Sequence, residues 1–367
     1  MKAVVLVGGF GTRLRPLSCT RPKQLFPIAN KPLLDWTFEG LSKGGVDEVI
    51  LATNYMANVL RRVFGNARGN LKITYSQERK PLGTGGPIKL LEKVLKNEEN
   101  FLVLNGDILS DTSYLKLVRN HKRFMKKFGG ITTITLHEVS EPSRFGVVKI
   151  DKFNRISRFI EKPRKEKGSV RLINAGTYVM TPEIFTCLME EKCSIERSVF
   201  PRLADQKKMC GFIHEGLWTD IGKVEDFIAA NFKIMKVIAK NKPLIGKNAE
   251  IHSTAKIIPP AIIGDGTKIG SRAKVGPYAS VGNEVDIGSG CRVENSILFN
   301  SSWIKPSASV IGAVIGEEAI VGQWVKLKKG CILGDHVTVS DNVTLREVTV
   351  CPYKEIEKSI LKPTQVM

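Results

Sequence analysis

The pattern of apolar residues changes near residue 243. Before that point, short apolar runs alternate with segments in which apolar residues recur at helical spacing. After it, apolar residues recur at every sixth position. The first pattern is typical of an α/β domain and the second of a repeat protein. We therefore predict two domains, residues 1–242 and residues 243–367.

Residues 1–242 are expected to form a mostly parallel sheet covered by helices, because the predicted strands and helices alternate along the chain. The predicted strands are residues 2–7, 47–53, 71–76, 101–105 and 131–137. The predicted helices are residues 32–44, 54–64, 84–96 and 112–127, with Pro32 at a first helical position and Gly44-Gly45 at a helix end. In such a Rossmann-like domain, ligands bind beyond the carboxyl ends of the strands.

Residues 243–367 repeat an apolar residue every six positions, often followed by glycine. The residues in register are Ile251, Ile257, Ile263, Ile269, Val275, Val281, Ile287 and Val293, and then Ile315, Val321, Leu327, Leu333, Val339 and Leu345. This period indicates a hexapeptide parallel β-helix, in which three short strands form each coil and apolar side chains stack inside. The register breaks between residues 294 and 314, where we expect a bulged or looser coil. The tail from Cys351 onward is expected to cap the end.

A glycine-rich loop follows the first predicted strand, in the segment KAVVLVGGFGTRLRPLSCTRPK of residues 2–23. Glycines let the backbone approach a ligand closely, and the cations Arg13 and Lys23 flank the loop. The segment lacks the Gly-Lys-Ser/Thr of a Walker A loop, and Leu14 stands where a dinucleotide fingerprint needs its last glycine. We therefore expect a triphosphate-binding loop of another kind; an ordinary tight turn is the alternative.

Two aspartates are candidate metal ligands. Asp107 follows the predicted strand 101–105 and is expected at the same edge of the sheet as the glycine-rich loop. Two carboxylates near a triphosphate would hold Mg²⁺, which binds carboxylate and phosphate oxygens. The second candidate is Asp220, in the segment GLWTDIG of residues 216–222, where a cap or an Asx-turn is the alternative.

Three further segments place polar groups at the ends of elements. Glu161 and Lys162 form a charged pair at a strand end, for which a surface ion pair is the default reading. Asn174 can present its amide to sugar hydroxyls or form part of a turn. The segment LGTGG of residues 82–86 opens a helix, which favours contacts with an anion or from the backbone to a base.

The charge of the chain is unevenly distributed. The net charge is +20, yet residues 245–367 carry 14 Lys and Arg against 12 Asp and Glu. The basic excess therefore lies in residues 1–244. We find no RNP, KH, zinc-finger or basic-helix pattern, so we expect no nucleic-acid partner. An active site for phosphorylated small molecules explains the same excess through electrostatic focusing.

Cysteine usage and hydropathy bear on the cellular compartment. Seven cysteines are scattered without CxxC pairs, which favours reduced thiols in a cytoplasmic protein over a disulfide framework or a zinc site. No apolar run approaches the roughly 20 residues that a membrane span needs, so we expect no membrane partner.

Taken together, these segments resemble the sugar-1-phosphate nucleotidylyltransferases. The family's GGxGTRLxPLT motif followed by PK is similar to residues 8–23, with Ser18 in place of threonine. Within the family, the chain is most similar to the guanylyltransferases that carry a C-terminal left-handed β-helix. The resemblance spans the whole chain and includes NKPLL at 30–34, PLGTGGP at 81–87, NGD at 105–107, FGVV at 145–148, EKP at 161–163, INAGTYV at 173–179, GLWTDIG at 216–222, VGQW at 321–324 and CPYKEIEKSI at 351–360.

The resemblance implies a role for each matching residue. Arg13 and Lys23 would neutralise the triphosphate and the sugar phosphate, with Asp107 as a further catalytic residue, and Asp107 and Asp220 would bind Mg²⁺. The nucleotide would be bound by Gly8, Gly9, Gly11, Thr12, Gln77, Gly83 and Thr84. The sugar phosphate would be bound by Gly146, Glu161, Lys162 and Asn174.

The implied reaction joins GTP and mannose-1-phosphate into GDP-mannose and pyrophosphate, by in-line attack of the sugar phosphate on the α-phosphorus. The related uridylyl-, thymidylyl- and adenylyltransferases of glucose-1-phosphate are the first alternative, because nothing physical in the sequence fixes the base. A non-catalytic regulatory subunit of the same fold is the second. The third is a bifunctional enzyme whose solenoid transfers acetyl groups, although His252 and His336 read as surface residues. We expect the β-helix to support a homo-oligomer.

Overall fold

The computed structural model describes residues 1–163, 171–189 and 192–367. They divide into two compact units. Residues 1–10 and 34–220 form the first, called here the α/β unit, and residues 11–33 and 221–367 form the second, called the β-helix unit.

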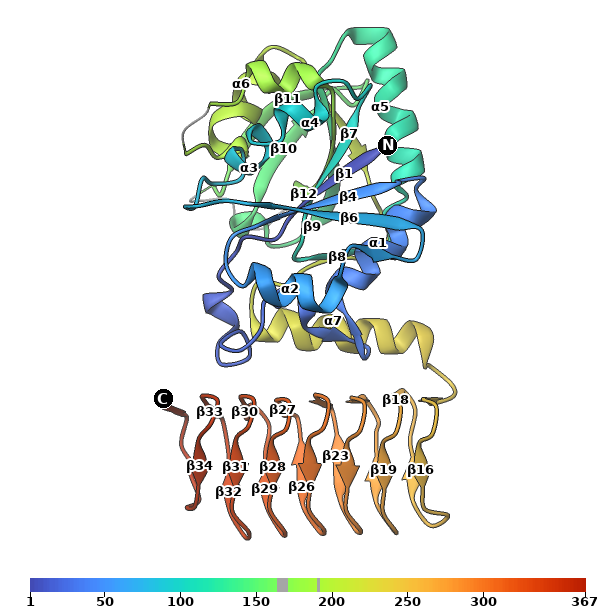
Figure 1. The fold of residues 1–367 in the computed structure, drawn as a ribbon, viewed down its shortest axis with the longest axis vertical. Helices are drawn as coiled ribbons and strands as arrows, with labels where there is room; N and C mark the ends of the chain where they lie inside the picture. The colour runs from blue at the N-terminus through green and yellow to red at the C-terminus, as the bar shows by residue number, and fades with distance from the viewer. Residues whose placement is uncertain (164–170, 190–191) are drawn as a thin grey trace. The chain divides into compact units, whose positions relative to one another are not determined.

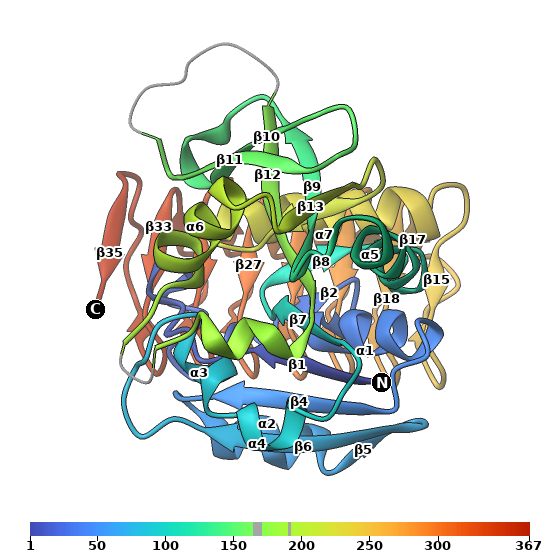
Figure 2. The ribbon, with the colours of Figure 1, turned by 90° about the horizontal axis from the view of Figure 1, so that it is seen from above.

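A ten-stranded sheet forms the core of the α/β unit. Along its main path the strands are β11 (Ile156–Glu161), β10 (Gly146–Ile150), β12 (Arg171–Met180), β7 (Phe101–Asn105), β1 (Lys2–Leu6), β4 (Glu48–Thr53), β6 (Leu71–Gln77) and β5 (Ala67–Arg68). Beside β12 lie β9 (Thr132–Val139) and then β13 (Met209–Ile213). Strands β7, β1, β4 and β6 run parallel, as Figure 2 shows, and antiparallel β12 joins them to the rest. The expected mostly parallel α/β sheet is thus confirmed.

Most predicted elements of this unit are present close to their expected bounds. The helices are α1 (Leu33–Lys43), α2 (Ala57–Phe64), α3 (Gly86–Lys89), α4 (Glu92–Leu95), α5 (Tyr114–Phe128) and α6 (Phe200–Asp205), with short turns at Pro142–Arg144, Pro182–Thr186 and Ile195–Val199. Two details were wrong. The helix expected over 84–96 is two short helices, because the chain leaves helical geometry at Leu91 (φ −94°, ψ 6°). Pro32 lies in a short strand that pairs with Pro27, one residue before α1.

The repeat region folds into stacked coils of three parallel sheets, as the six-residue period predicts (Figure 1). The first sheet contains β15 (Leu244–Ile245), β18 (Ala261–Ile263), β21 (Ala279–Val281), β24 (Ser296–Leu298), β27 (Val314–Ile315), β30 (Ile332–Leu333), β33 (Val348–Val350) and β35 (Thr364–Val366). The second contains β16 (Glu250–Ile251), β19 (Lys268–Ile269), β22 (Asp286–Ile287), β25 (Trp303–Ile304), β28 (Ile320–Val321), β31 (Thr338–Val339) and β34 (Glu355–Ile356). The third contains β17 (Lys256–Ile257), β20 (Lys274–Val275), β23 (Arg292–Glu294), β26 (Ser309–Ile311), β29 (Lys326–Leu327) and β32 (Thr344–Leu345).

Glycines in this repeat serve close stacking between coils. A Cβ on Gly264 would lie only 2.3 Å from the carbonyl oxygen of Gly282 in the next coil. Apolar residues in register, such as Val281 and Ile287, are fully buried inside the coils. The tail also joins the stack, because β34 and β35 pair with β31 and β33.

The coils at residues 294–314 are shorter rather than looser. Val293 is followed after five positions, instead of six, by Leu298, and Val310 is followed in the same way by Ile315. All four residues are buried, and the strands pair without a bulge. The expectation of a bulged coil was wrong because one residue is removed at the same corner of successive coils, which shifts the sequence register and keeps the stacking.

Residues 11–33, called here the arm, pack within the β-helix unit together with α7 (Val224–Ile238). The arm contains short turns at Thr12–Leu14 and Lys23–Leu25 and the small hairpin of β2 (Pro27–Ile28) and β3 (Lys31–Pro32). Asn231 of α7 accepts a hydrogen bond from Ala29 N (2.8 Å) and donates to Pro27 O (3.1 Å). Phe26, Phe227 and Phe299 form an edge-to-face cluster with ring centroids 5.3 to 6.3 Å apart. The arm, α7 and the coils therefore share one core.

Candidate active site

The glycine-rich loop and Asp107 leave the sheet at the same edge. Leu6 at the end of β1 lies opposite Asn105 at the end of β7, and Gly106 N donates to Leu6 O (2.9 Å). A Cβ on Gly106 would lie 2.6 Å from a methyl carbon of Val7, so only glycine allows this approach. Gly8 and Gly9 follow β1 at this edge, where parallel sheets bind their ligands.

Asp107 and Asp220 are neighbours on one small ribbon. Strand β8 (Ile108–Ser110) begins directly after Asp107 and pairs with antiparallel β14 (Trp218–Asp220), which sets Asp220 opposite Ile108. Arg144 also contacts this ribbon, with Nη2 3.3 Å from Asp220 Oδ2. Among the described residues, no group of three or more His, Cys, Asp or Glu side chains could hold a metal ion. Two adjacent carboxylates nonetheless fit a hard cation that takes its other ligands from phosphates and water.

A bulge in β12 brings Gly176, two residues after Asn174, into contact with this ribbon. Between Asn174 and Tyr178 the pairing with β9 is interrupted, and Gly176 adopts a left-handed conformation (φ 70°). A Cβ on Gly176 would lie 2.3 Å from Ile108 and 2.7 Å from Asn105. Asn174 uses Oδ1 to accept from Gly176 N and Nδ2 to donate to the Tyr178 hydroxyl, both at 3.0 Å. The segments INAG and NGD, distant in sequence, are therefore in contact.

Gly146 and Glu161 lie opposite each other on β10 and β11. A Cβ on Gly146 would lie 3.0 Å from a carboxylate oxygen of Glu161, so glycine lets this carboxylate pack closely against the backbone of β10. Burial raises the pKa of Glu161, while Lys162, with Nζ 3.5 Å from Oε1, lowers it. Burial also raises the pKa of Tyr178, with further contributions from Glu196, Glu161 and Asp107. The charges of these three carboxylates thus all act on one buried phenol.

Gly83 and Thr84 are held by the segment 193–196. Gly83 has φ 79°, and a Cβ there would lie 2.4 Å from Cys193 O, which requires glycine. The Thr84 hydroxyl donates to Glu196 Oε2 (2.5 Å) and accepts from Ile195 N (3.0 Å). These contacts mean that Gly83 and Thr84 also hold the segment 193–196 in place, in addition to their expected role in nucleotide binding.

Gln77 and Glu78 have opposite environments at the end of β6. Gln77 is exposed, whereas Glu78 is buried beside the glycine-rich loop, and a Cβ on Gly8 would lie 3.9 Å from Glu78 Oε2. Asn54 Nδ2 donates to Glu78 Oε2 (3.3 Å), while Oε1 is buried without a hydrogen-bond partner among the described residues. Burial raises the pKa of Glu78, and hydrogen bonds from Asn54 and the Leu82 backbone lower it.

The remaining expected site residues lie in the arm, which belongs to the β-helix unit. Gly11 takes a left-handed conformation (φ 61°), and Ser18 Oγ donates to its carbonyl oxygen (2.7 Å). Thr12 and Arg13 follow as an exposed turn, and Lys23 begins the next turn. The structure thus assigns the expected phosphate-binding cations to one short, internally bonded segment.

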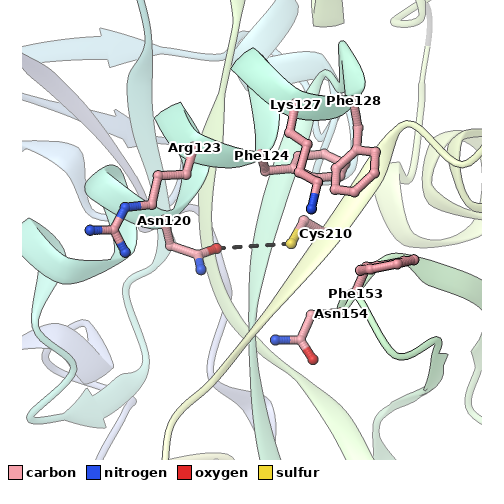
Figure 3. A pocket seen from close by; sticks show the side chains of 8 residues that line it. All are labelled: Asn120, Arg123, Phe124, Lys127, Phe128, Phe153, Asn154 and Cys210. Carbon is pink, nitrogen blue, oxygen red and sulfur yellow. Dashed lines mark hydrogen bonds between the residues drawn. The ribbon is translucent and has the colours of Figure 1, made fainter.

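A surface cavity of about 170 Å³ elsewhere on the α/β unit contains none of these residues. Figure 3 shows Asn120 of α5 directed at Cys210 of β13 (3.9 Å from Oδ1 to Sγ). Burial raises the pKa of Cys210 to about 12, so its thiol is protonated near neutrality. The cavity is lined by Asn120, Arg123, Phe124, Lys127, Phe128, Phe153, Asn154 and Cys210.

Two protein-family models match the chain. The model described as nucleotidyl transferase matches residues 2–237, and the model described as GMPPB C-terminal domain matches residues 257–366. A mannose-1-phosphate guanyltransferase of Aspergillus oryzae is 38% identical over 373 residues, and mannose-1-phosphate guanylyltransferase 1 of Arabidopsis thaliana is 36% identical over 372, each with 100% of both chains covered. The chain belongs to the mannose-1-phosphate guanylyltransferase family.

Solved structures also resemble the guanylyltransferase. The crystal structure of HddC from Yersinia pseudotuberculosis is 29% identical with a TM-score of 0.54, and its complex with GMP-PN is 30% identical with a TM-score of 0.52. Each match covers 64% of this chain and 99% of HddC. Nucleotidyl transferases of this family commonly use a divalent metal ion.

Reasoning from the sequence missed three residues that the structure places beside expected site residues. Arg144 pairs with Asp220, Glu196 holds Thr84, and Glu78 lies against Gly8. Glu78 had a signal in the sequence, because it follows a strand within the motif-rich segment 77–87. Arg144 and Glu196 had none, since both meet their partners only through the folding of distant segments.

Proposed function

We propose that this chain transfers GMP from GTP to mannose-1-phosphate, giving GDP-mannose and pyrophosphate. The observation that supports the chemistry is the pair Asp107 and Asp220 on one ribbon, at the sheet edge where the glycine-rich loop begins. Full-length similarity to mannose-1-phosphate guanylyltransferases supports the substrates.

The reaction needs no covalent nucleophile from the protein. An oxygen of the sugar phosphate attacks the α-phosphorus of GTP, the bond from that phosphorus to the bridging oxygen breaks, and pyrophosphate leaves. The protein must bring two anions together and reduce their repulsion, so positioning and electrostatic stabilisation supply the rate. We assign this role to Arg13 and Lys23, while Gly8, Gly9, Gly11 and Thr12 offer backbone and hydroxyl groups to the nucleotide.

Asp107 and Asp220 would hold Mg²⁺, and Arg144 would orient Asp220. When bound, the ion would offset charge on the triphosphate and on the developing leaving group. Glu161 would accept hydrogen bonds from the sugar hydroxyls, and the amide of Asn174 would donate to them. Lys162 would bind the phosphate of the sugar. Gly146 would leave space for the sugar beside Glu161.

Recognition of the base is assigned to Glu78, together with Gln77, Gly83 and Thr84. Guanine carries two adjacent donors, N1–H and the 2-amino group, and an ionised carboxylate can accept from both. Adenine offers no such pair. Glu78 lies beside Gly8 of the glycine-rich loop, and its Oε1 has no hydrogen-bond partner among the described residues, which supports this assignment.

The decisive experiment is a turnover panel of GTP, ATP, UTP and dTTP against mannose-1-phosphate and glucose-1-phosphate, with pyrophosphate release as the readout. We expect the fastest release with GTP and mannose-1-phosphate. Preference for another pair would support a related transferase instead. A well-folded chain that releases no pyrophosphate with any pair would support a regulatory subunit.

Three wider proposals concern the domains, the assembly and the location of the enzyme. We propose that residues 1–242 form the catalytic domain and residues 243–367 the left-handed β-helix domain. We propose that the β-helix supports a homo-oligomer, because Trp303, Trp324 and Tyr353 expose 44 to 71% of their surface on it; light scattering tests this. The seven free thiols support a cytoplasmic protein. Among the described residues, no helix is long and apolar enough to cross a membrane.

A further inference from the structure

A buried ion pair ties the arm to the coils of the β-helix. Arg21 Nη2 donates to Asp335 Oδ2 and to Glu317 Oε2, and the Thr20 hydroxyl also donates to Asp335 Oδ2. The guanidinium lies 5.2 Å from the centroid of the Phe299 ring. Asp335 exposes only 2% of its side chain and Arg21 15%. Burial lowers the pKa of Arg21, but the two carboxylates and their hydrogen bonds outweigh it and raise this pKa, so the guanidinium stays charged.

Asp335 is itself fixed by the stacking of the coils. Its Oδ1 accepts a hydrogen bond from Glu317 N one coil earlier (2.8 Å). The same contact recurs along this corner, where Asp265 Oδ1 accepts from Lys247 N and Asn283 Oδ1 accepts from Asp265 N. One oxygen of Asp335 therefore makes the hydrogen bond that recurs between coils, and the other accepts hydrogen bonds from the arm. Glu317 adds a second carboxylate from the adjacent coil.

Arg21 stands between the two cations that the proposed mechanism needs. Lys23 lies two residues after it, and Arg13 lies earlier in the same arm. Ser18 ties the segment back to Gly11, so the arm between Gly11 and Lys23 is internally braced and attached to the coils at Thr20 and Arg21. A buried carboxylate such as Asp335 is costly without its partner, which couples the arm strongly to the coil.

We propose that Arg21 is a positioning residue, and that its ion pairs with Asp335 and Glu317 make the β-helix part of the catalytic apparatus. The coils hold the arm in one conformation, and the arm presents Arg13 and Lys23 in fixed positions. This inference rests on the proposed roles of Arg13 and Lys23 in binding phosphate. It gives the β-helix a role in turnover in addition to assembly.

The end of the arm is attached independently of Arg21. Ser280 Oγ donates to Asn30 Oδ1 (2.8 Å), Asn30 Nδ2 donates to Val281 O, and Phe26 packs in the aromatic cluster with Phe227. Removal of the Arg21 side chain should therefore leave the β-helix unit folded. It should release only the part of the arm that carries the two cations.

The test measures kcat and KM for GTP in Arg21→Ala and in the milder Glu317→Gln, together with thermal unfolding. We expect kcat to fall at least about tenfold in Arg21→Ala and less in Glu317→Gln, because transition-state contacts of the arm are lost. Added guanidinium ion should restore part of the kcat of Arg21→Ala. The matched control is Arg292→Ala, which removes a bidentate pair with Glu294 elsewhere on the β-helix and should leave kcat unchanged.

Normal kcat in Arg21→Ala and Glu317→Gln would overturn the proposal, even if the unfolding temperature fell, because that result would describe a structural contact alone. If Arg21→Ala fails to fold, a normal kcat in Glu317→Gln decides against the proposal and a reduced one decides for it. Arg13→Ala and Lys23→Ala separate the two proposals. If these variants turn over normally, the assigned mechanism is wrong. If they are inactive while both Arg21→Ala and Glu317→Gln are active, only the positioning role of Arg21 is wrong.

Discussion

At the scale of single residues, the candidate site depends on glycines as well as on charged side chains. Gly106, Gly146 and Gly176 each occupy a point where a Cβ would lie within 2.6 Å of a neighbouring atom. Gly106 lets the turn before Asp107 pack against the end of β1, and Gly146 lets β10 pack closely against Glu161. Gly176 lets the bulge after Asn174 pack against Ile108 and Asn105.

Asp107→Ala should lower kcat/KM by at least about a hundredfold, the usual loss when one transition-state stabiliser is removed. The reason is that Asp220 alone would hold the metal ion weakly. Steady-state kinetics at saturating Mg²⁺ checks this. The control is Asp47→Ala, which removes an exposed carboxylate that pairs with the N-terminus. Near-normal turnover of a folded Asp107→Ala variant would refute the assignment.

Glu78→Gln should reduce discrimination for guanine by about tenfold or more, since a bidentate contact to a base contributes roughly 1–3 kcal/mol. An amide cannot accept from both donors of guanine. The measurement is the ratio of kcat/KM for GTP to that for ATP, compared with the same ratio in the control variant Asp47→Ala. An unchanged ratio would assign base recognition to other groups.

At the scale of elements, packing of helix α5 against the sheet buries a histidine and changes its pKa. Its inner face packs Leu117, His121 and Phe124 at helical spacing, and His121 Nδ1 is 2.9 Å from the Thr133 hydroxyl on β9. Burial lowers the pKa of His121 to about 4 from 6.5. The folded protein therefore keeps this histidine neutral over a range in which the unfolded chain is protonated.

The stability contributed by neutral His121 is fully present above pH 6.5 and is lost as the pH falls toward 4, because the unfolded state then binds more protons. The free energy of unfolding should drop by up to about 3 kcal/mol over this interval from this group. His121→Gln should flatten the dependence, measured by urea unfolding at several pH values. The exposed His252→Gln should keep the wild-type slope, and equal slopes in all three proteins would contradict the prediction.

At the scale of the whole molecule, contacts between distant segments define the β-helix unit. The arm near the start of the chain packs with α7 and with coils some 300 residues later, through Arg21 and Asp335 and through Phe26 and Phe299. The change of periodicity predicted that the C-terminal part of the chain forms stacked parallel coils, as the structure shows. It gave no indication that the repeat has a partner at the beginning of the chain, and the boundary between residues 242 and 243 stays a prediction.

A chain that ends at residue 242 should lose turnover and cooperative unfolding, because Phe26 and Phe227 would lose Phe299 and Arg21 would lose both carboxylates. Pyrophosphate release and thermal unfolding, compared with the full chain, check this. A chain that ends at residue 362, which lacks the terminal strand β35, should retain both properties. Full activity of the 1–242 fragment would show that the coils are dispensable.

The sequence alone determined what local pattern can encode. Most strands and helices of the sheet and the coils of the β-helix follow from spacing along the chain, because side-chain periodicity reports secondary structure directly. The short motifs around Gly8, Asp107 and Asp220 are visible in the sequence, and the resemblance to a known family gave Asp220 its expected role. Tertiary structure decided which chemically similar residues meet. Glu78 rather than Gln77 lies buried beside Gly8, coils at 294–314 shorten without loosening, and Arg21 finds Asp335. Such pairings depend on packing between segments far apart in the chain, and no local pattern carries that information.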